Sequence, residues 1–153
     1  MKRIRINTIF EHGKDFQPFG SSYIRLLRPL SHPNVQEDLE VIFSTDYIQG
    51  GKMDLVIIDR LWRPDISMGF AEILINKIRK DGAKIIYAID DNFHKLLAGT
   101  ENQKYLENLP IVEYFIEHSN GVLVTTPALR EAYSYLNPNI VVLPHALDER
   151  LLI

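Results

Sequence analysis

Three side chains that could take part in chemistry stand together in the run Asp90-Asp91-Asn92, directly after an apolar stretch that ends at Ile89. Two carboxylates and an amide can bind sugar hydroxyls, hold a divalent metal or activate a nucleophile. Asp90 and Asp91 are therefore the candidate catalytic residues, and Asn92 is a candidate substrate-binding residue. A metal is disfavoured, because adjacent carboxylates on a strand end point to opposite sides. In a purely structural interpretation, Asp91 or Asn92 caps the next segment and Asp90 pairs with Arg60.

A second set of polar residues lies in the loop from Glu11 to Ser22, between an apolar run and a predicted helix. Gly20, Ser21 and Ser22 offer free backbone amides and hydroxyl groups at the positive end of that helix, which suits an anionic or polyol ligand. The loop is neither a dinucleotide-binding fingerprint nor a P-loop, because it lacks both G-x-G-x-x-G and G-K-[ST]. Alternatively, Ser21 or Ser22 only caps the helix.

Arg60, Trp62 and Arg63 form a third group, after another apolar run. A cationic and aromatic cluster of this kind can hold a phosphate or stack on a sugar face, although a solvated turn before Pro64 would show the same residues. The five histidines have no H-x-x-x-H spacing, and the chain contains neither cysteine nor a G-x-S-x-G motif. These absences exclude a thiolate zinc site and a cysteine nucleophile, and they disfavour a helical metal pair and the common hydrolases.

The composition is typical of one globular domain spanning residues 1–153. The chain has 17 basic and 20 acidic side chains, so its net charge of −3 disfavours nucleic-acid or anionic-membrane binding. No apolar stretch approaches the roughly 18 residues of a membrane span, which predicts no transmembrane segment. The lack of cysteine fits a reducing compartment, and we expect a cytoplasmic protein.

The elements that must position these residues follow from six short apolar runs separated by helical patterns. The predicted strands are Ile4 to Phe10, Leu39 to Ser44, Leu55 to Ile58, Ile85 to Ile89, Val122 to Val124 and Ile140 to Leu143. The predicted helices begin at Ser21 or Ser22, at Ser67, near Pro110 and at Thr126-Pro127. In the helix from Ser67 to Lys80, we expect Phe70, Ile73, Leu74 and Ile78 to form the buried stripe.

Alternation of strands and helices predicts an α/β fold: a Rossmann-like, doubly wound, mostly parallel six-stranded sheet with helices on both faces. The first run alternates in polarity more than the others, so we expect its strand to be less fully covered. Ligands of such sheets bind beyond the carboxyl ends of the strands. Function is therefore expected in the loops Glu11 to Gly20 and Asn92 to Gln103.

Four segments also bear a resemblance to a known family. The run from 139 to 148 reads N-I-V-V-L-P-H-A-L-D and resembles a V-x-V-I-P-N-G-V-D motif, with His145 in place of the usual Asn. Residues 119–129, read S-N-G-V-L-V-T-T-P-A-L, resemble A-D-x-V-I-V-S-T-x-x-L, and residues 85–92 resemble I-x-E-I-D-D. Residues 19–26, read F-G-S-S-Y-I-R-L, resemble a first-loop helix start. In this order, the segments resemble the N-terminal domain of GT-B glycosyltransferases of the family 4 type.

The resemblance implies one half of a GT-B fold, in which two Rossmann-like domains face each other across a cleft. The N-terminal domain binds the acceptor, such as a glycan or a lipid-linked sugar, and the C-terminal domain binds the nucleotide-sugar donor. The chain resembles only the first, so we expect the donor-binding domain to be absent from these residues. The implied chain is an incomplete catalyst with no metal or other cofactor of its own, and the nucleotide-sugar belongs to the full-length enzyme.

The same resemblance places the predicted site residues around the cleft. Asp90 takes roughly the position of a sugar-contacting histidine. Asp91 and Asn92 line the cleft, Arg60 faces the acceptor, and Thr125 and Thr126 lie at the floor of the cleft. The predicted substrate-binding set is Gly20, Ser21, Ser22, Arg25, Arg60, Asn92, Thr125, Thr126 and His145. We expect Asp91→Asn or Arg25→Ala to lower transferase turnover and leave the fold intact. The alternative function is a stand-alone, non-catalytic Rossmann-like module that binds a ligand or a protein.

Overall fold

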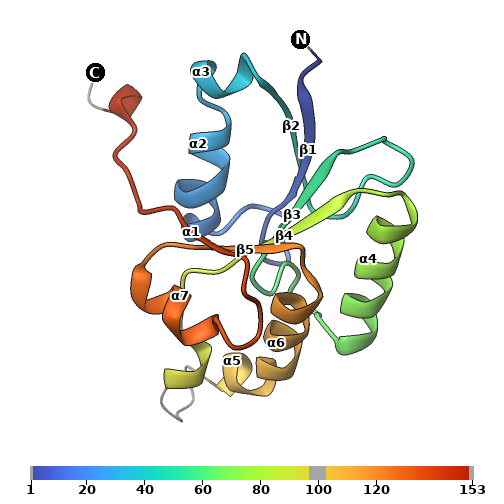
Figure 1. Ribbon diagram of the computed structural model, residues 1–153, viewed down its shortest axis with the longest axis vertical. Helices are drawn as coiled ribbons and strands as arrows, with labels where there is room; N and C mark the ends of the chain where they lie inside the picture. Colours follow the sequence, from blue (N-terminus) through green and yellow to red (C-terminus); the bar gives the residue numbers. More distant parts are fainter. Residues whose placement is uncertain (1, 97–102, 152–153) are drawn as a thin grey trace.

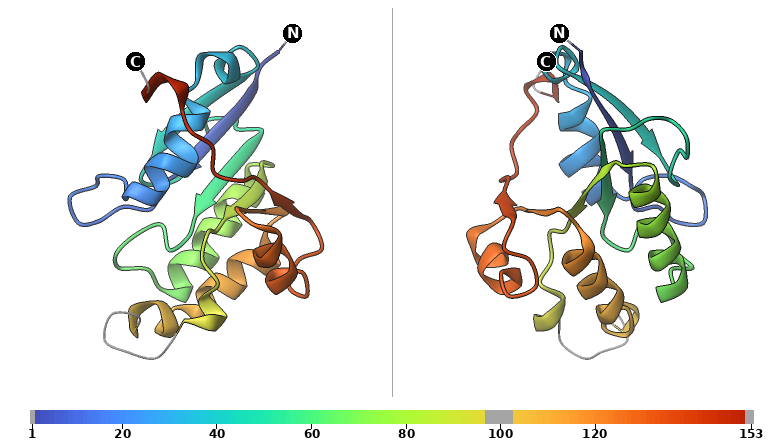
Figure 2. Two further views of the ribbon diagram at one scale, coloured as in Figure 1. Left: turned by 90° about the vertical axis from the view of Figure 1, so that its left-hand side faces the viewer. Right: turned by 45° about the vertical axis from the view of Figure 1, so that its right-hand side comes forward.

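The predicted strands form one six-stranded parallel sheet in the computed structural model, which describes residues 2–96 and 103–151 (Figure 1). Their bounds are β1 Ile4–Ile9, β2 Leu39–Ser44, β3 Leu55–Asp59, β4 Lys84–Ala88, β5 Gly121–Val124 and β6 Ile140–Val142. Every neighbouring pair of strands is parallel. Helices cover both faces, so the predicted α/β class and its Rossmann-like, doubly wound architecture are confirmed (Figures 1 and 2).

The order of the strands across the sheet is β2-β1-β3-β4-β5-β6. The chain leaves β1 toward β2 on one side and then returns to build β3 and the later strands on the other side. The loops after β1 and β3 therefore leave the sheet toward opposite faces. In open parallel sheets, the crevice between two such loops is the usual ligand site.

The helices divide into two groups by the face that they cover. One helical segment covers β1, β3 and β4 on one face: α1 (Gly20–Ser22), a π-helical turn η1 (Tyr23–Leu27) and α2 (Arg28–Leu30), followed by α3 (Pro33–Gln36). On the other face lie α4 (Met68–Lys80), α6 (Leu109–His118) and α7 (Pro127–Tyr133). The remaining short elements are η2 (Phe93–Lys95), α5 (Gln103–Glu107) and η3 (Glu149–Leu151).

The larger part of the core lies between the sheet and α4, α6 and α7. The buried stripe of α4 contains the predicted Leu74 and Ile78, but Phe70 and Ile73 are 37% and 52% exposed, and Ala71 and Ile75 are fully buried instead. Ala71 and Ile75 belong to the main core cluster, whereas the Arg63 guanidinium covers the exposed Phe70 ring at 4.1 Å.

The expectation of a less covered first strand is also wrong. Residues 6–9 of β1 are all buried, because β1 lies inside the sheet between β2 and β3. The partly exposed strands are β2 and β6, which form the two edges of the sheet. Among the described residues, no helix has both the length and the apolar character needed to cross a membrane.

Candidate functional site

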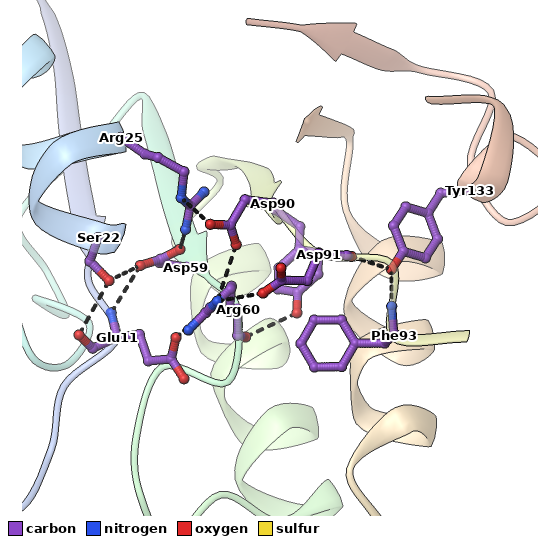
Figure 3. A network of polar contacts seen from close by, with 10 residues as sticks. Glu11, Ser22, Arg25, Asp59, Arg60, Asp90, Asp91, Phe93 and Tyr133 are labelled. Atoms are coloured by element: carbon purple, nitrogen blue, oxygen red, sulfur yellow. Dashed lines mark hydrogen bonds and ion pairs between the residues drawn. The ribbon is translucent and has the colours of Figure 1, made fainter. Parts of the chain in front are cut away.

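Charged side chains from three neighbouring strand ends meet at the carboxyl edge of the sheet, under the first turns of the α1–α2 segment (Figure 3). The loop after β1, the end of β3 and the segment after β4 each contribute carboxylates, and the helical segment adds a hydroxyl and a guanidinium. We call this cluster the carboxyl-edge network; its members are Glu11, Ser22, Arg25, Asp59, Arg60, Asp90 and Asp91.

Asp59 is the buried centre of one half of the network, and its side chain has no exposed surface. Nη2 of Arg25 donates to Oδ1 of Asp59 at 2.6 Å, and the Ser22 hydroxyl and the Glu11 amide both donate to Oδ2. Nε of Arg25 also lies 3.1 Å from Oδ2 of Asp90, an ion pair without hydrogen-bond alignment. These donors satisfy a carboxylate that would otherwise be strongly destabilising in the core.

Arg60 organises the other half. Its Nε donates to Oε2 of Glu11 at 2.6 Å, and its Nη1 donates to Oδ1 of Asp90 at 3.2 Å and to Oδ2 of Asp91 at 2.7 Å. Burial opposes the charge of Arg60, but attraction to Glu11 and Asp90 outweighs burial, so the pKa of the guanidinium lies above its ordinary value. Arg60 therefore remains a fixed positive charge that draws three carboxylates together.

The backbone of Arg60 adopts a strained conformation at the centre of this arrangement. Its φ of +40° lies in the left-handed region that bulky side chains rarely adopt. The Arg60 amide donates to the carbonyl of Ala88 at 3.0 Å, and the Tyr87 hydroxyl donates to the carbonyl of Arg60 at 3.0 Å. These bonds to β4 hold the turn in place. Strained residues held by their surroundings cluster at functional sites.

Exposure within the network is graded. Asp59 and Glu11 are buried, Asp90 keeps 14% of its side-chain surface exposed, and Asp91 keeps 50%. The segment that presents Asp91 is fixed by Tyr133, whose hydroxyl donates to the Asp91 carbonyl at 2.7 Å and accepts from the Phe93 amide at 3.0 Å. Asp91 is therefore the carboxylate of the network that a ligand can reach, and its backbone is held in place by Tyr133.

The structural interpretation of Asp90 and Asn92 is confirmed. Asp90 pairs with Arg60, and the Asn92 side chain accepts from the His94 amide at 3.2 Å to cap η2. In contrast, the expectation that Asp90 and Asp91 point to opposite sides is wrong, since both contact Nη1 of Arg60. Strand geometry does not apply to them because β4 ends at Ala88.

The predicted helix-start residues have different environments. Gly20 is exposed and Ser21 is partly buried, whereas Ser22 is fully buried and bonded to Asp59. The expectation that Ser21 or Ser22 caps the helix is wrong, because the capping position is Phe19 and it makes no side-chain cap bond. The Ser22 hydroxyl instead joins the helix to the end of β3.

The remaining predicted residues lie toward the carboxyl ends of β5 and β6. Thr126 caps α7 by accepting from the Leu129 amide at 3.2 Å. Thr125 and His145 line a small cavity of about 110 Å³ together with Arg25, so the structure connects these two residues to the network through Arg25. The predicted Arg60-Trp62-Arg63 cluster is divided in part: Arg60 joins the network, whereas Arg63 lies 5.4 Å from the centroid of the buried Trp62 ring and pairs with Asp65.

Sequence reasoning missed Asp59 and the role of Glu11. The available signal was the acidic residue that ends the apolar run L-V-I-I-D, because a carboxylate that completes a buried strand needs charged or hydrogen-bonding partners. In the described part of the chain, no three or more His, Cys, Asp or Glu side chains are grouped so that they could hold a metal ion.

No protein-family model matches the chain, and no curated protein matches it.

Proposed function

We propose that the carboxyl-edge network binds a sugar acceptor, and that the chain is the acceptor-binding N-terminal domain of a glycosyltransferase that uses a nucleotide-sugar donor. The observation that supports this most strongly is Asp91, a half-exposed carboxylate after β4 that pairs with Arg60, in a network that extends to the point between β1 and β3 where the strand order reverses. Ligands of parallel α/β sheets bind at this point.

The chemistry of Asp91 suits a polyhydroxylated ligand. An ionised carboxylate offers about four acceptor positions, and Arg60 uses one of the two oxygens of Asp91. The remaining positions can accept from sugar hydroxyls. Because the buried network fixes Arg60 and Asp90 beside it, the carboxylate is oriented before a ligand arrives, which lowers the entropy lost on binding.

The pairing of the other carboxylates favours binding over self-sufficient catalysis. Asp90 contacts two guanidinium groups, and Asp59 accepts from three donors. These contacts already occupy both carboxylates with partners from within the chain. In this proposal, donor binding belongs to a second domain outside these 153 residues. From the lack of cysteine, we assign the enzyme to the cytoplasm.

The test is sugar transfer by the polypeptide as its source cell makes it, incubated with labelled nucleotide-sugars and a cell extract as acceptor. Asp91→Asn keeps the shape but weakens hydrogen-bond acceptance, and we expect kcat/KM to fall about tenfold, equivalent to roughly 1.4 kcal/mol. Asp38→Asn is the matched control, because Asp38 is an exposed residue outside the network. The proposal would be contradicted if no nucleotide-sugar were consumed, or if Asp91→Asn kept wild-type turnover. Either result would favour the stand-alone binding module.

A further inference from the structure

A second cavity lies beside the carboxyl-edge network. It is lined by the predicted functional loop after β1 and by Arg63 of the third predicted group, but by none of the predicted catalytic or substrate-binding residues. It has a volume of about 420 Å³ and is formed by the loops after β1, β2 and β3. We call it the loop cavity; the residues used below are His12, Lys14, Phe16, Asp46, Arg63 and Asp65. The loop after β1 projects from the body of the domain here (Figure 2). A cavity of this volume is in the range that takes small ligands.

The loop after β1 is held in place although it projects. The His12 amide donates to the carbonyl of Trp62 at 3.0 Å, and the Phe19 amide donates to the carbonyl of Glu11 at 3.0 Å. A β-bridge between His12 and Pro18 closes the loop at its base. Glu11, the residue before His12, belongs to the carboxyl-edge network, so one short segment joins the two sites.

His12 presents a defined hydrogen-bond acceptor. Its Nδ1 lies 2.7 Å from the carbonyl oxygen of Gly13. A carbonyl can only accept, so Nδ1 carries the proton, and in the neutral ring Nε2 is then an acceptor. Among the hydrogen bonds of the described residues, His12 uses its ring only through Nδ1. The residue is 95% buried, which fixes the ring.

Phe16 presents an aromatic face at the same cavity. Its ring stacks on the His12 ring, with centroids 5.2 Å apart, and the residue is 64% exposed. Its φ is +60°, a conformation that glycine adopts freely and phenylalanine rarely. An exposed aromatic residue at such a position favours function over folding as the reason for its side chain.

The charges around the loop cavity favour a neutral ligand. Arg63 and Asp65 form a two-bond pair, with Nε to Oδ1 at 2.6 Å and Nη2 to Oδ2 at 2.9 Å. Asp46 accepts from the Tyr47 amide at 2.7 Å, and Lys14 supplies the second cation. The two cations and two carboxylates balance, so net charge favours neither an anionic nor a cationic ligand, whereas a neutral polyol can bond to groups of both signs.

We propose that the loop cavity is a second sugar subsite, in which a sugar ring stacks on Phe16 and one of its hydroxyls donates to Nε2 of His12. The inference rests on the proposed function and makes it more specific. The acceptor is then an oligosaccharide, with one unit at the carboxyl-edge network and a further unit in the loop cavity.

Binding of defined saccharides to the 153-residue chain tests the subsite. The probes are mono-, di- and trisaccharides of glucose, galactose, mannose and N-acetylglucosamine. The readout is the fluorescence of Trp62, the single tryptophan, whose Nε1 donates to the carbonyl of the cavity residue Thr45 at 2.8 Å. We expect at least one di- or trisaccharide to bind about tenfold more tightly than its monosaccharide.

Phe16→Gly removes the stacking ring at a backbone angle that glycine tolerates, so the fold is retained. We expect the variant to bind the longer saccharide no better than the monosaccharide. Lys52→Gly is the matched control, because Lys52 also has a positive φ, of +51°, and does not line the cavity. It should keep the full preference. In nitrogen NMR spectra of the His12 ring, the longer saccharide should shift Nε2 and the monosaccharide should not.

The outcomes separate the subsite from the proposed function. The subsite would be overturned, and the proposed function would stand, if Asp91→Asn weakens monosaccharide binding but longer saccharides bind no more tightly than the monosaccharide. The same conclusion would follow if Phe16→Gly kept the tighter binding of the longer saccharide. Failure of every saccharide to bind would overturn both.

Discussion

Replacing Arg25 by alanine tests how strongly the carboxyl-edge network holds the α1–α2 segment on the sheet. The Arg25 side chain is 5% exposed and contacts Asp59, whose side chain is fully buried, and Asp90, whose side chain is 14% exposed. Arg25→Ala leaves Asp59 with only the Ser22 hydroxyl and the Glu11 amide as donors. Because of these contacts, we expect the variant to be less stable than the original chain, in contrast to the expectation from the sequence that the fold stays intact.

The magnitude follows from the burial of the pair. Breaking a buried ion pair by removing one partner destabilises a protein by about 3–5 kcal/mol, because the remaining charge is left uncompensated. A domain of ordinary stability unfolds with about 5–15 kcal/mol, so the loss is a large fraction of the total. At roughly 2–4 °C per kcal/mol for a chain of this size, Tm should fall by about 6–20 °C.

Urea unfolding followed by circular dichroism measures the loss. Arg79→Ala is the matched control, because the Arg79 guanidinium makes an exposed hydrogen bond to the His118 carbonyl, and we expect it to lose less than about 1 kcal/mol. Arg25→Ala combined with Asp59→Asn should regain part of the stability, since the second change removes the unpaired charge. The reasoning is refuted if Arg25→Ala is as stable as Arg79→Ala.

Three further predictions concern the fold. Asn137→Ala should lose about 2–3 kcal/mol in chemical denaturation, because the buried Asn137 amide donates to two backbone carbonyls at 2.8 and 2.9 Å; a loss below about 0.5 kcal/mol would show that water replaces these bonds. Burial raises the pKa of Tyr47 and Tyr133 to about 12, and for Tyr47 a hydrogen bond to a carboxylate adds to the effect. The contribution of these two tyrosines to the free energy of unfolding is therefore complete below about pH 10 and is lost as pH rises toward 12. The tyrosinate absorbance should reveal this delayed ionisation, whereas normal titration of every tyrosine would contradict it. Gly82→Ala should lose about 1 kcal/mol in thermal unfolding, since Gly82 ends α4 at φ +81° with open space around it; an unchanged Tm would oppose this assignment.

The sheet was predictable because strands buried on both faces leave a strong pattern. The run Leu55 to Ile58 is uninterrupted by polar residues, and the structure places it inside the sheet as β3. Helix faces were harder to predict, as α4 shows. Phe70 has the more apolar side chain, but Ala71 is the buried residue, and the Phe70 ring is covered by the Arg63 guanidinium, a contact that periodicity does not contain.

The candidate site was predictable only as far as the strand ends. Position after a strand identified Asp90, Asp91 and Arg60. Their partners Glu11 and Asp59 depend on β1 lying next to β3, a neighbour relation that periodicity does not contain. The loop after β1 was predicted as a functional region, but its role in the loop cavity was not, because the backbone angle and stacking of Phe16 become visible only in three dimensions.

The most direct test of the central claim is to follow the backbone amide signals of the chain by NMR while the saccharide panel is added. Binding at the carboxyl-edge network predicts that the largest shifts fall on residues 90–93 and on Arg60, and that Asp91→Asn weakens the response. Shifts confined to other parts of the surface, or an equal response in Asp91→Asn, would contradict the assignment of this network as the acceptor site.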